Sequence, residues 1–306
     1  MAAKATKRLI KPKAIDMECL MSTGKGAVSR DPGMIEMLAA YFKTMGLRIK
    51  TEDEQAQDWR DAGTQVVIMS QAHKLLGFTE WEQVVERHNY IGQLKKDYPD
   101  VILGFWVGIS IADFSIWKAL KEVERCIKDL GSFGVFVTGM YGIPANDKMW
   151  WPFYDMCQDA GVPVKISVGA TAGGAGQGGG SVGGMGIRLS TEKPIPNVDD
   201  VAAAFPNLTI IGHHYPFPWV DEMTAVMIHK NNVYCEVHGW RPKYFHDNFR
   251  RELNTRIKNK IMFGSDYPFF PYATLFGDWE ASNYKPEVLQ NVYLNTARKV
   301  LGLEGK

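Results

Sequence analysis

Eight short runs of β-branched and aromatic residues recur along the chain, each bounded by turn residues, and they constrain the fold more than any other feature. They span residues 14–20, 65–70, 101–108, 134–140, 162–169, 208–215, 232–239 and 260–267. Most are separated by amphipathic stretches long enough for a helix, such as 116–130 and 150–160. Apolar strands that alternate with helices predict a parallel sheet buried on both faces. We therefore expect an α/β protein with a (β/α)8 TIM barrel rather than a doubly wound sheet.

The junctions between the expected helices and strands repeat the same local signals. Gly63 and Gly161 each follow a helical stretch and precede a β-branched run, where glycine supplies the left-handed residue that ends a helix. Pro99 and Pro206 stand at two further junctions and end a helix, because proline cannot continue it. The repeats indicate one series of αβ units. We expect a single barrel domain over residues 1–306, of which 1–13 form an N-terminal tail.

Composition and charge exclude several classes of protein. Of the 306 residues, 45% are hydrophobic and 23% charged, which is typical of a globular chain with a large core. Lys and Arg number 35 against 34 Asp and Glu, so the net charge of +1 offers no field to hold nucleic acid or an anionic membrane. No apolar run reaches the ~18 residues of a membrane span, and no apolar run follows the basic N-terminus as an export signal requires.

Cysteine usage gives an expectation about the compartment. Cys19, Cys126, Cys157 and Cys235 are widely spaced and form no CxxC pair. This spacing suits neither a disulfide framework nor a zinc ribbon. We expect reduced, buried thiols in a cytoplasmic protein.

A glycine-rich segment directly follows the fifth expected strand. It runs through residues 169–190 and begins GATAGGAGQGGGSVGGMG. The segment is no phosphate-binding P-loop, because no Gly-Lys-Ser/Thr ends it. Two interpretations stay open, a mobile lid over the barrel mouth or a disordered insertion.

Polar residues gather at the carboxyl ends of the expected strands, where TIM barrels carry their chemistry. Four of the seven histidines fall there, namely His73, His213, His214 and His238. The same ends carry Glu18, Tyr141, Ser167, Glu236 and Asp266. His88, His229 and His246 fall on expected helices or connections, where a solvated or capping histidine is the ordinary explanation.

The second half of the chain resembles the amidohydrolase-related family. The resemblance rests on IIGHHYPFPWVDEM at 210–223, NVY at 232–234, IMFGSDYPF at 261–269 and NTARKVLG at 295–302. The branch it resembles includes the aminocarboxymuconate-semialdehyde, γ-resorcylate and 5-carboxyvanillate decarboxylases. It is specific from about the fifth strand to the C-terminus and weaker, but in register, before that.

The resemblance implies a divalent metal at the barrel mouth. In the family, strand one supplies two ligands one residue apart, strand five a histidine and strand eight an aspartate, while a strand-six histidine carries the proton. Glu18, His213 and Asp266 match three of these positions, so the resemblance implies that they are the catalytic residues. Leu20 stands in place of the second strand-one ligand.

Strand five also departs from the family pattern. It offers Ser167, Gly169 or Ala170 where the metal-ligating histidine should fall. Two carboxylates, Glu18 and Asp266, form a weak site for a hard cation. We therefore expect either no metal or a weakly bound Zn²⁺, Mn²⁺ or Mg²⁺.

Each candidate also has an ordinary structural explanation. Asp266 could cap the segment that follows it, and Glu18 could form a structural salt bridge, although a buried carboxylate needs a cation or a hydrogen-bonded histidine. Adjacent strand residues point to opposite faces, so only one of His213 and His214 should face the barrel interior. The motif favours His213. His238 shares a face with Glu236 and could replace the missing ligand.

Substrate contacts are expected from a further group of residues. A guanidinium matches a carboxylate in two hydrogen bonds, which makes Arg241 and Arg188 candidates, with Lys165 as a third basic candidate. Surface solvation is the default for all three. We also expect substrate-binding roles for His238, His73 and Tyr141, although His73 is more often a loop residue.

These observations favour an enzyme that cleaves a C–C bond of a cyclic or aromatic carboxylic acid, as a decarboxylase or a C–C hydrolase, by acid/base catalysis. Catabolism of aromatic compounds is the expected setting. The alternatives are a metal-independent hydrolase of a lactone or cyclic dione, and a catalytically silent binding protein on the same fold. The expected partner is the small-molecule acid. Trp106, Trp117, Trp150 and Trp151 allow an apolar surface for a homodimer.

Overall fold

The computed structural model describes residues 11–41, 48–170, 184 and 186–305. These residues form eight parallel strands in the order of the sequence. The strands are β1 (Ala14–Cys19), β2 (Thr64–Ala72), β3 (Ile102–Ile109), β4 (Gly134–Val137), β5 (Val164–Ser167), β6 (Ile210–His213), β7 (Val233–Val237) and β8 (Ile261–Phe263). Each lies within or close to one of the eight apolar runs. The predicted TIM barrel is confirmed.

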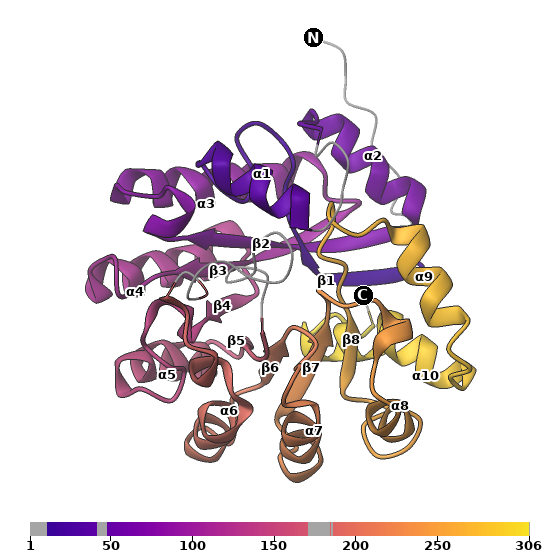
Figure 1. Cartoon of the computed structure of the whole chain (residues 1–306). Helices are drawn as coiled ribbons and strands as arrows, with labels where there is room; N and C mark the ends of the chain where they lie inside the picture. Colours follow the sequence, from indigo (N-terminus) through magenta and orange to yellow (C-terminus); the bar gives the residue numbers. More distant parts are fainter. Residues whose placement is uncertain (1–10, 42–47, 171–183, 185, 306) are drawn as a thin grey trace.

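Helices surround the strands on the outside of the barrel (Figure 1). In chain order they are α1 (Pro32–Tyr41), α2 (Glu52–Ala62), α3 (Trp81–Asp97), α4 (Ile116–Arg125), α5 (Trp151–Asp159), α6 (Pro194–Ala204), α7 (Val220–His229), α8 (Asp247–Leu253), α9 (Tyr272–Glu280), α10 (Pro286–Gln290) and α11 (Thr296–Val300). The expected helix at 116–130 consists of α4 and one π-helical turn, Cys126–Leu130. Because each strand is covered on both sides, nearly all strand residues are buried.

The helix ends follow the glycine and proline signals. Gly63 and Gly161 both have a φ of +65°, the left-handed conformation that glycine adopts without steric cost. Helix α3 ends two residues before Pro99, and α6 ends two residues before Pro206. At these four junctions the local sequence thus sets where the helix ends and the next strand begins.

β1 and β8 meet where the barrel closes. The backbone N–H of Leu20 donates to the carbonyl of Tyr267 at 2.8 Å, and Asp266 N–H donates to the carbonyl of Glu18 at 3.0 Å. Asp16 reinforces the junction, because its carboxylate accepts hydrogen bonds from the backbone N–H and hydroxyl of Ser265. Asp16 also accepts a hydrogen bond from the Tyr272 hydroxyl at 2.7 Å. Strand β1 is therefore fixed in position next to β8.

Two sequence expectations fall partly outside the described residues. Of the N-terminal tail, 1–10 lie outside them, and of the glycine-rich segment, 171–183 and 185 do. Gly169, at the start of that segment, donates its N–H to the carbonyl of Glu192.

The burial of particular side chains tests two further expectations. All four cysteines are free and buried, as expected. Trp106 and Trp150 are buried in the core, which is incompatible with a place on a dimer surface, whereas Trp117 is 73% exposed and Trp151 37% exposed.

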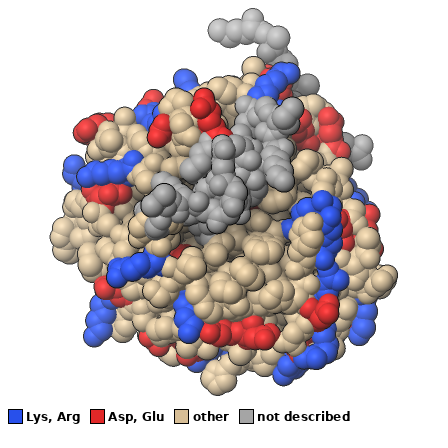
Figure 2. Space-filling model, in the orientation of Figure 1, with Lys and Arg blue, Asp and Glu red and all other residues tan. Residues whose placement is uncertain are grey.

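No described helix has both the length and the hydropathy to cross a membrane. Basic and acidic side chains are interspersed along the perimeter of the face in Figure 2, in keeping with the net charge near zero.

Candidate active site

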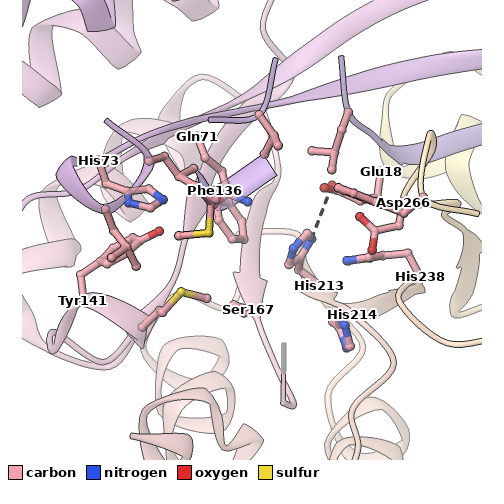
Figure 3. Close-up of a pocket in the computed structure, with 17 residues that line it drawn as sticks. Glu18, Gln71, His73, Phe136, Tyr141, Ser167, His213, His214, His238 and Asp266 are labelled. Atoms are coloured by element: carbon pink, nitrogen blue, oxygen red, sulfur yellow. Dashed lines mark ion pairs between the residues drawn. The ribbon is translucent and has the colours of Figure 1, made fainter. Parts of the chain in front are cut away.

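A cavity of about 120 Å³ lies at the carboxyl ends of the barrel strands. One side carries titratable groups, and Figure 3 shows Glu18, Asp266 and His238 close together there, with His213 beside them. The rest of the lining is largely apolar or aromatic and includes Leu20, Val28, Met34, Leu75, Leu76, Phe136, Met140, Tyr141 and Phe269. The cavity is of the order of the ~150 Å³ space that holds a benzene ring in an engineered protein core. It therefore suits a small, partly apolar molecule.

Lys165 lies beneath this charged side, in the centre of the barrel. It projects inward from β5, is completely buried, and donates hydrogen bonds to Glu18 Oε2 at 2.6 Å and to the Met17 carbonyl at 2.7 Å. Its Nζ also lies 3.1 Å from Glu236 Oε1. Burial alone disfavours the ammonium, but the two carboxylates outweigh burial and raise the pKa of Lys165. Lys165 is therefore a fixed positive charge.

Glu236, on β7, joins Lys165 to two histidines. His238 Nδ1 lies 2.8 and 2.9 Å from the two oxygens of Glu236, and His213 Nδ1 lies 2.8 Å from Oε1. Burial opposes ionisation of Glu236, yet His238 and Lys165 together hold the pKa of its carboxyl well below the usual range. Glu236 is thus the permanent negative charge of the cluster.

The two histidines are driven to opposite protonation states. Burial lowers the pKa of His213 well below its usual range, and the charges of Lys165 and His238 lower it further. Burial also disfavours the charged form of His238, but Glu236 outweighs burial and raises the pKa of His238 to about 9. At neutral pH the site therefore holds a neutral imidazole and an imidazolium, with ring centroids 4.4 Å apart. A neutral imidazole can accept a proton and a neighbouring imidazolium can donate one, as acid/base catalysis requires.

The two carboxyl groups at the cavity are less acidic than usual. Burial raises the pKa of Glu18 to about 7, against the lowering effect of Lys165 and His238. Burial likewise raises the pKa of Asp266, which His238 partly offsets. Asp266 reaches the cavity through a left-handed backbone, with a φ of +58° directly after β8. Glu18 can accordingly exchange a proton near neutral pH.

His214 departs from the strand alternation that was expected. It lines the same cavity as His213, and its ring packs edge-on against His238 at 4.7 Å. Strand β6 ends at His213, and His214 has a φ of +96°, so its side chain does not continue the alternating pattern. The expectation that only one of the two faces the interior is therefore wrong. Burial lowers the pKa of His214 to about 3, and its Nδ1 lies 2.9 Å from the Tyr215 carbonyl oxygen.

The other side of the cavity carries His73 and Tyr141, as Figure 3 shows. Their rings lie 4.1 Å apart, and neither His73 Nδ1 nor the Tyr141 hydroxyl has a hydrogen-bond partner among the described residues. Burial lowers the pKa of His73 to about 3, so this side offers neutral polar atoms. Phe136 lies between the two sides and packs against His213, with ring centroids 4.5 Å apart.

The basic candidates lie elsewhere. Arg241 forms two hydrogen bonds with Asp278 and does not line the cavity. Arg188 lines a neighbouring hollow with Tyr141 and Met140. Lys165, expected to bind a substrate carboxylate, is instead enclosed by Glu18 and Glu236. His238 is therefore the only group lining the cavity, among the described residues, whose pKa is raised enough to keep it positively charged at neutral pH.

Sequence reasoning missed the central roles of Lys165 and Glu236. The alternation of strand residues carried the signal, because Lys165 and Ser167 share one face of β5, and Glu236 and His238 share one face of β7. A lysine and a glutamate that point into a barrel core must find partners, since an unpaired buried charge is too costly.

Comparisons with known proteins agree with this architecture. A comparison with curated proteins found no match. Among solved structures, an uncharacterised TIM-barrel protein from Bordetella bronchiseptica is similar with a TM-score of 0.73 at 20% identity, covering 96% of this chain and 99% of the other. 5-Carboxyvanillate decarboxylase from Sphingomonas paucimobilis has a TM-score of 0.64 at 14% identity, covering 94% and 98%. A dihydroxybenzoic acid decarboxylase from Polaromonas sp. JS666, solved with manganese and 2-nitroresorcinol, has a TM-score of 0.66 at 14% identity, covering 96% and 98%.

The fold and the cavity at the strand ends define a protein of the TIM-barrel type. The sequence profile of the amidohydrolase family matches residues 68–303. The chain therefore belongs to the amidohydrolase family.

The residues at the cavity fit a divalent metal poorly. Glu18, His213 and His238 place one ligand atom each within 4.8 Å of one another, which makes them a candidate metal group. However, Glu18 Oε2 already accepts a hydrogen bond from the Lys165 ammonium at 2.6 Å. Ser167 contributes only a hydroxyl. A divalent ion would have to displace or face a fixed positive charge, so we derive no step of the reaction through a metal.

Proposed function

We propose that this protein is an enzyme that cleaves a carbon–carbon bond of a cyclic or aromatic carboxylic acid. The observation that carries the proposal is the pairing of a neutral His213 with a protonated His238 in a cavity whose remaining lining is largely apolar. An aromatic acid brings an apolar ring and one negative charge. The ring suits Phe136 and its apolar neighbours, and the carboxylate suits the His238 imidazolium.

Decarboxylation requires a proton at the ring carbon that carries the carboxylate. We assign this transfer to His213, which takes up the proton from water; the Glu18 carboxylate, whose Oε2 lies 3.6 Å from His213 Nδ1, favours the imidazolium form by its charge. A bound carboxylate adds negative charge to the cavity, which raises the pKa of His213 and favours its protonated form. The proton bonds to the ring carbon, the C–COO⁻ bond then breaks, and its electron pair returns to the ring as CO₂ leaves. Asp266 holds the imidazolium of His238 by charge.

A second candidate is the hydrolysis of a lactone or cyclic dione without a metal. It is favoured by the resting state of His213, because burial keeps its imidazole neutral and a neutral imidazole can act as a general base toward water. The Lys165 charge supports it too, because it leaves little place for a metal. In this reaction water adds to the carbonyl carbon, and the ring C–O or C–C bond breaks.

One experiment separates these reactions. Purified protein is incubated in deuterated water with a panel of hydroxybenzoic, cyclic keto and lactone substrates, and products are followed by mass spectrometry. Decarboxylation releases CO₂ and places one deuterium on the carbon that lost it. Hydrolysis adds the elements of water and releases no CO₂. Binding of a panel member without turnover would support the silent binding protein instead. Asp266→Asn serves as the inactive control.

The proposal keeps other expectations open. A cytoplasmic location, a homodimer, and contacts of substrate with Arg188, His73 or Tyr141 stay predictions. Of these residues, His73 and Tyr141 line the cavity, which supports a role for them in binding.

A further inference from the structure

Lys165 lies in the interior of the barrel, where a lysine is almost never found unless its charge is paired. Its side chain is completely buried and has three oxygen partners, Glu18 Oε2, Glu236 Oε1 and the Met17 carbonyl. Two of these partners are carboxylates, which are ligands that a divalent cation prefers. The ammonium therefore sits in an oxygen cage of the kind that holds a metal ion.

The cage belongs to the cavity described above. Glu18 lines the cavity directly, and Glu236 contacts both His213 and His238, which line it as well. Any cation in the cage therefore fixes the positions of all three cavity residues. Lys165 itself does not line the cavity, so it acts through them as a positioning residue.

We infer that the Lys165 ammonium replaces a divalent metal as the cation of this site. One covalently attached charge holds Glu18 and Glu236 where a metal ion would otherwise hold its ligands. Ser167, two residues further along β5, adds a hydroxyl at the cavity rather than a nitrogen ligand. The inference concerns the site of the proposed function but not its reaction, so it can fail or hold independently of the substrate.

The inference predicts that removal of the lysine creates a metal site. Lys165→Ala leaves the carboxylates of Glu18 and Glu236 without a counter-charge, which divalent ions would then neutralise. Mn²⁺ is titrated into wild type and Lys165→Ala by calorimetry, with metal content measured after gel filtration. We expect no saturable Mn²⁺ site in wild type, and one Mn²⁺ per chain in the variant, with an affinity at least about 100-fold above the highest that the wild-type titration would leave undetected.

Two control variants and one further measurement make the result specific. Lys260→Ala removes a half-buried lysine that donates to the carbonyls of Lys230 and Asn231, and it should gain no metal. Lys165→Met with Glu18→Gln removes the ammonium and a carboxylate together and should bind no Mn²⁺. Thermal unfolding shows whether Mn²⁺ stabilises Lys165→Ala but not wild type.

Two outcomes overturn the inference. The first is one tightly bound Mn²⁺ per wild-type chain, which would show that a metal and Lys165 coexist. The second is a Lys165→Ala protein that gains neither Mn²⁺ binding nor thermal stabilisation by Mn²⁺. Because wild type is titrated in any case, the inference stays testable even if the variant does not fold. No substrate is used, so neither result depends on the reaction.

Discussion

His238 contacts both oxygens of the Glu236 carboxylate through a single nitrogen, Nδ1, at 2.8 and 2.9 Å. The contact keeps an imidazolium inside a cavity where burial alone would discharge it. The arrangement links the charge of the site to pH.

The pH dependence of activity should be bell-shaped. Glu18, whose pKa is raised to about 7, is increasingly ionised above that pH, and His238, whose pKa is raised to about 9, loses its proton above that value. If kcat/KM requires the Glu18 carboxylate and the His238 imidazolium, it should rise near pH 7 and fall near pH 9. His238→Gln should remove the upper limb. An unchanged upper limb in this variant would assign it to another group.

Asp266→Asn should abolish turnover and leave the fold intact. The substitution keeps the shape of the side chain and removes the negative charge that faces the His238 imidazolium. Turnover of an active panel substrate and circular dichroism are measured on the same preparation. Wild-type rates in the folded variant would contradict the assigned role.

His213→Ala should reduce kcat by about 10²-fold or more, the usual contribution of a general acid or base. His214→Ala should cost less, because His214 packs on His238 and bonds to the Tyr215 carbonyl without facing Glu236 Oε1. Both rates are compared with wild type at the pH optimum. Equal losses would mean that the proton carrier has been assigned to the wrong histidine.

Activity should survive a strong chelator. The positive charge beside Glu18 comes from Lys165, and a lysine cannot be extracted. Turnover after prolonged dialysis against EDTA should match that of untreated protein, and added Zn²⁺ or Mn²⁺ should raise it little. Loss of activity with one ion per chain, restored when the ion is returned, would instead indicate metal-dependent decarboxylation.

Asp16→Ala should lower the free energy of unfolding by about 2–4 kcal/mol. It leaves the Ser265 N–H, the Ser265 hydroxyl and the Tyr272 hydroxyl without their buried acceptor. Urea unfolding should show a lower midpoint with an unchanged slope. The matched control is Asp155→Ala, an exposed aspartate on α5, which should change the free energy of unfolding by less than about 0.5 kcal/mol. Similar losses in both would show that Asp16 does not secure the barrel closure.

The barrel was predictable from the sequence because its signals are local. Gly63, Gly161, Pro99 and Pro206 act on the residues next to them, and the apolar runs reflect burial on both faces. The identity of the cavity residues was partly predictable for the same reason. Glu18, His213 and Asp266 lie at or just beyond the carboxyl ends of strands, which must meet at one end of the barrel.

The sequence did not indicate which of these side chains contact one another. The contact between Lys165 and Glu18 joins strands far apart in the chain, and no local pattern encodes which inward charge meets which. The expectation for His214 was wrong for a different reason. Strand alternation holds only while the strand continues, and β6 ends one residue before His214. Arg241 was assigned by its place near a strand end, but Asp278 on α9 bonds to it instead.

Strand β1 carries the residue that secures the barrel seam, Asp16, only two positions before Glu18. Closure of the barrel between β1 and β8 therefore also brings Glu18 to the cavity. A folding intermediate in which β1 has not yet docked against β8 lacks the Glu18 carboxylate, and Lys165 has lost one of its anions. Recovery of catalytic activity during refolding would therefore report the docking of β1 against β8.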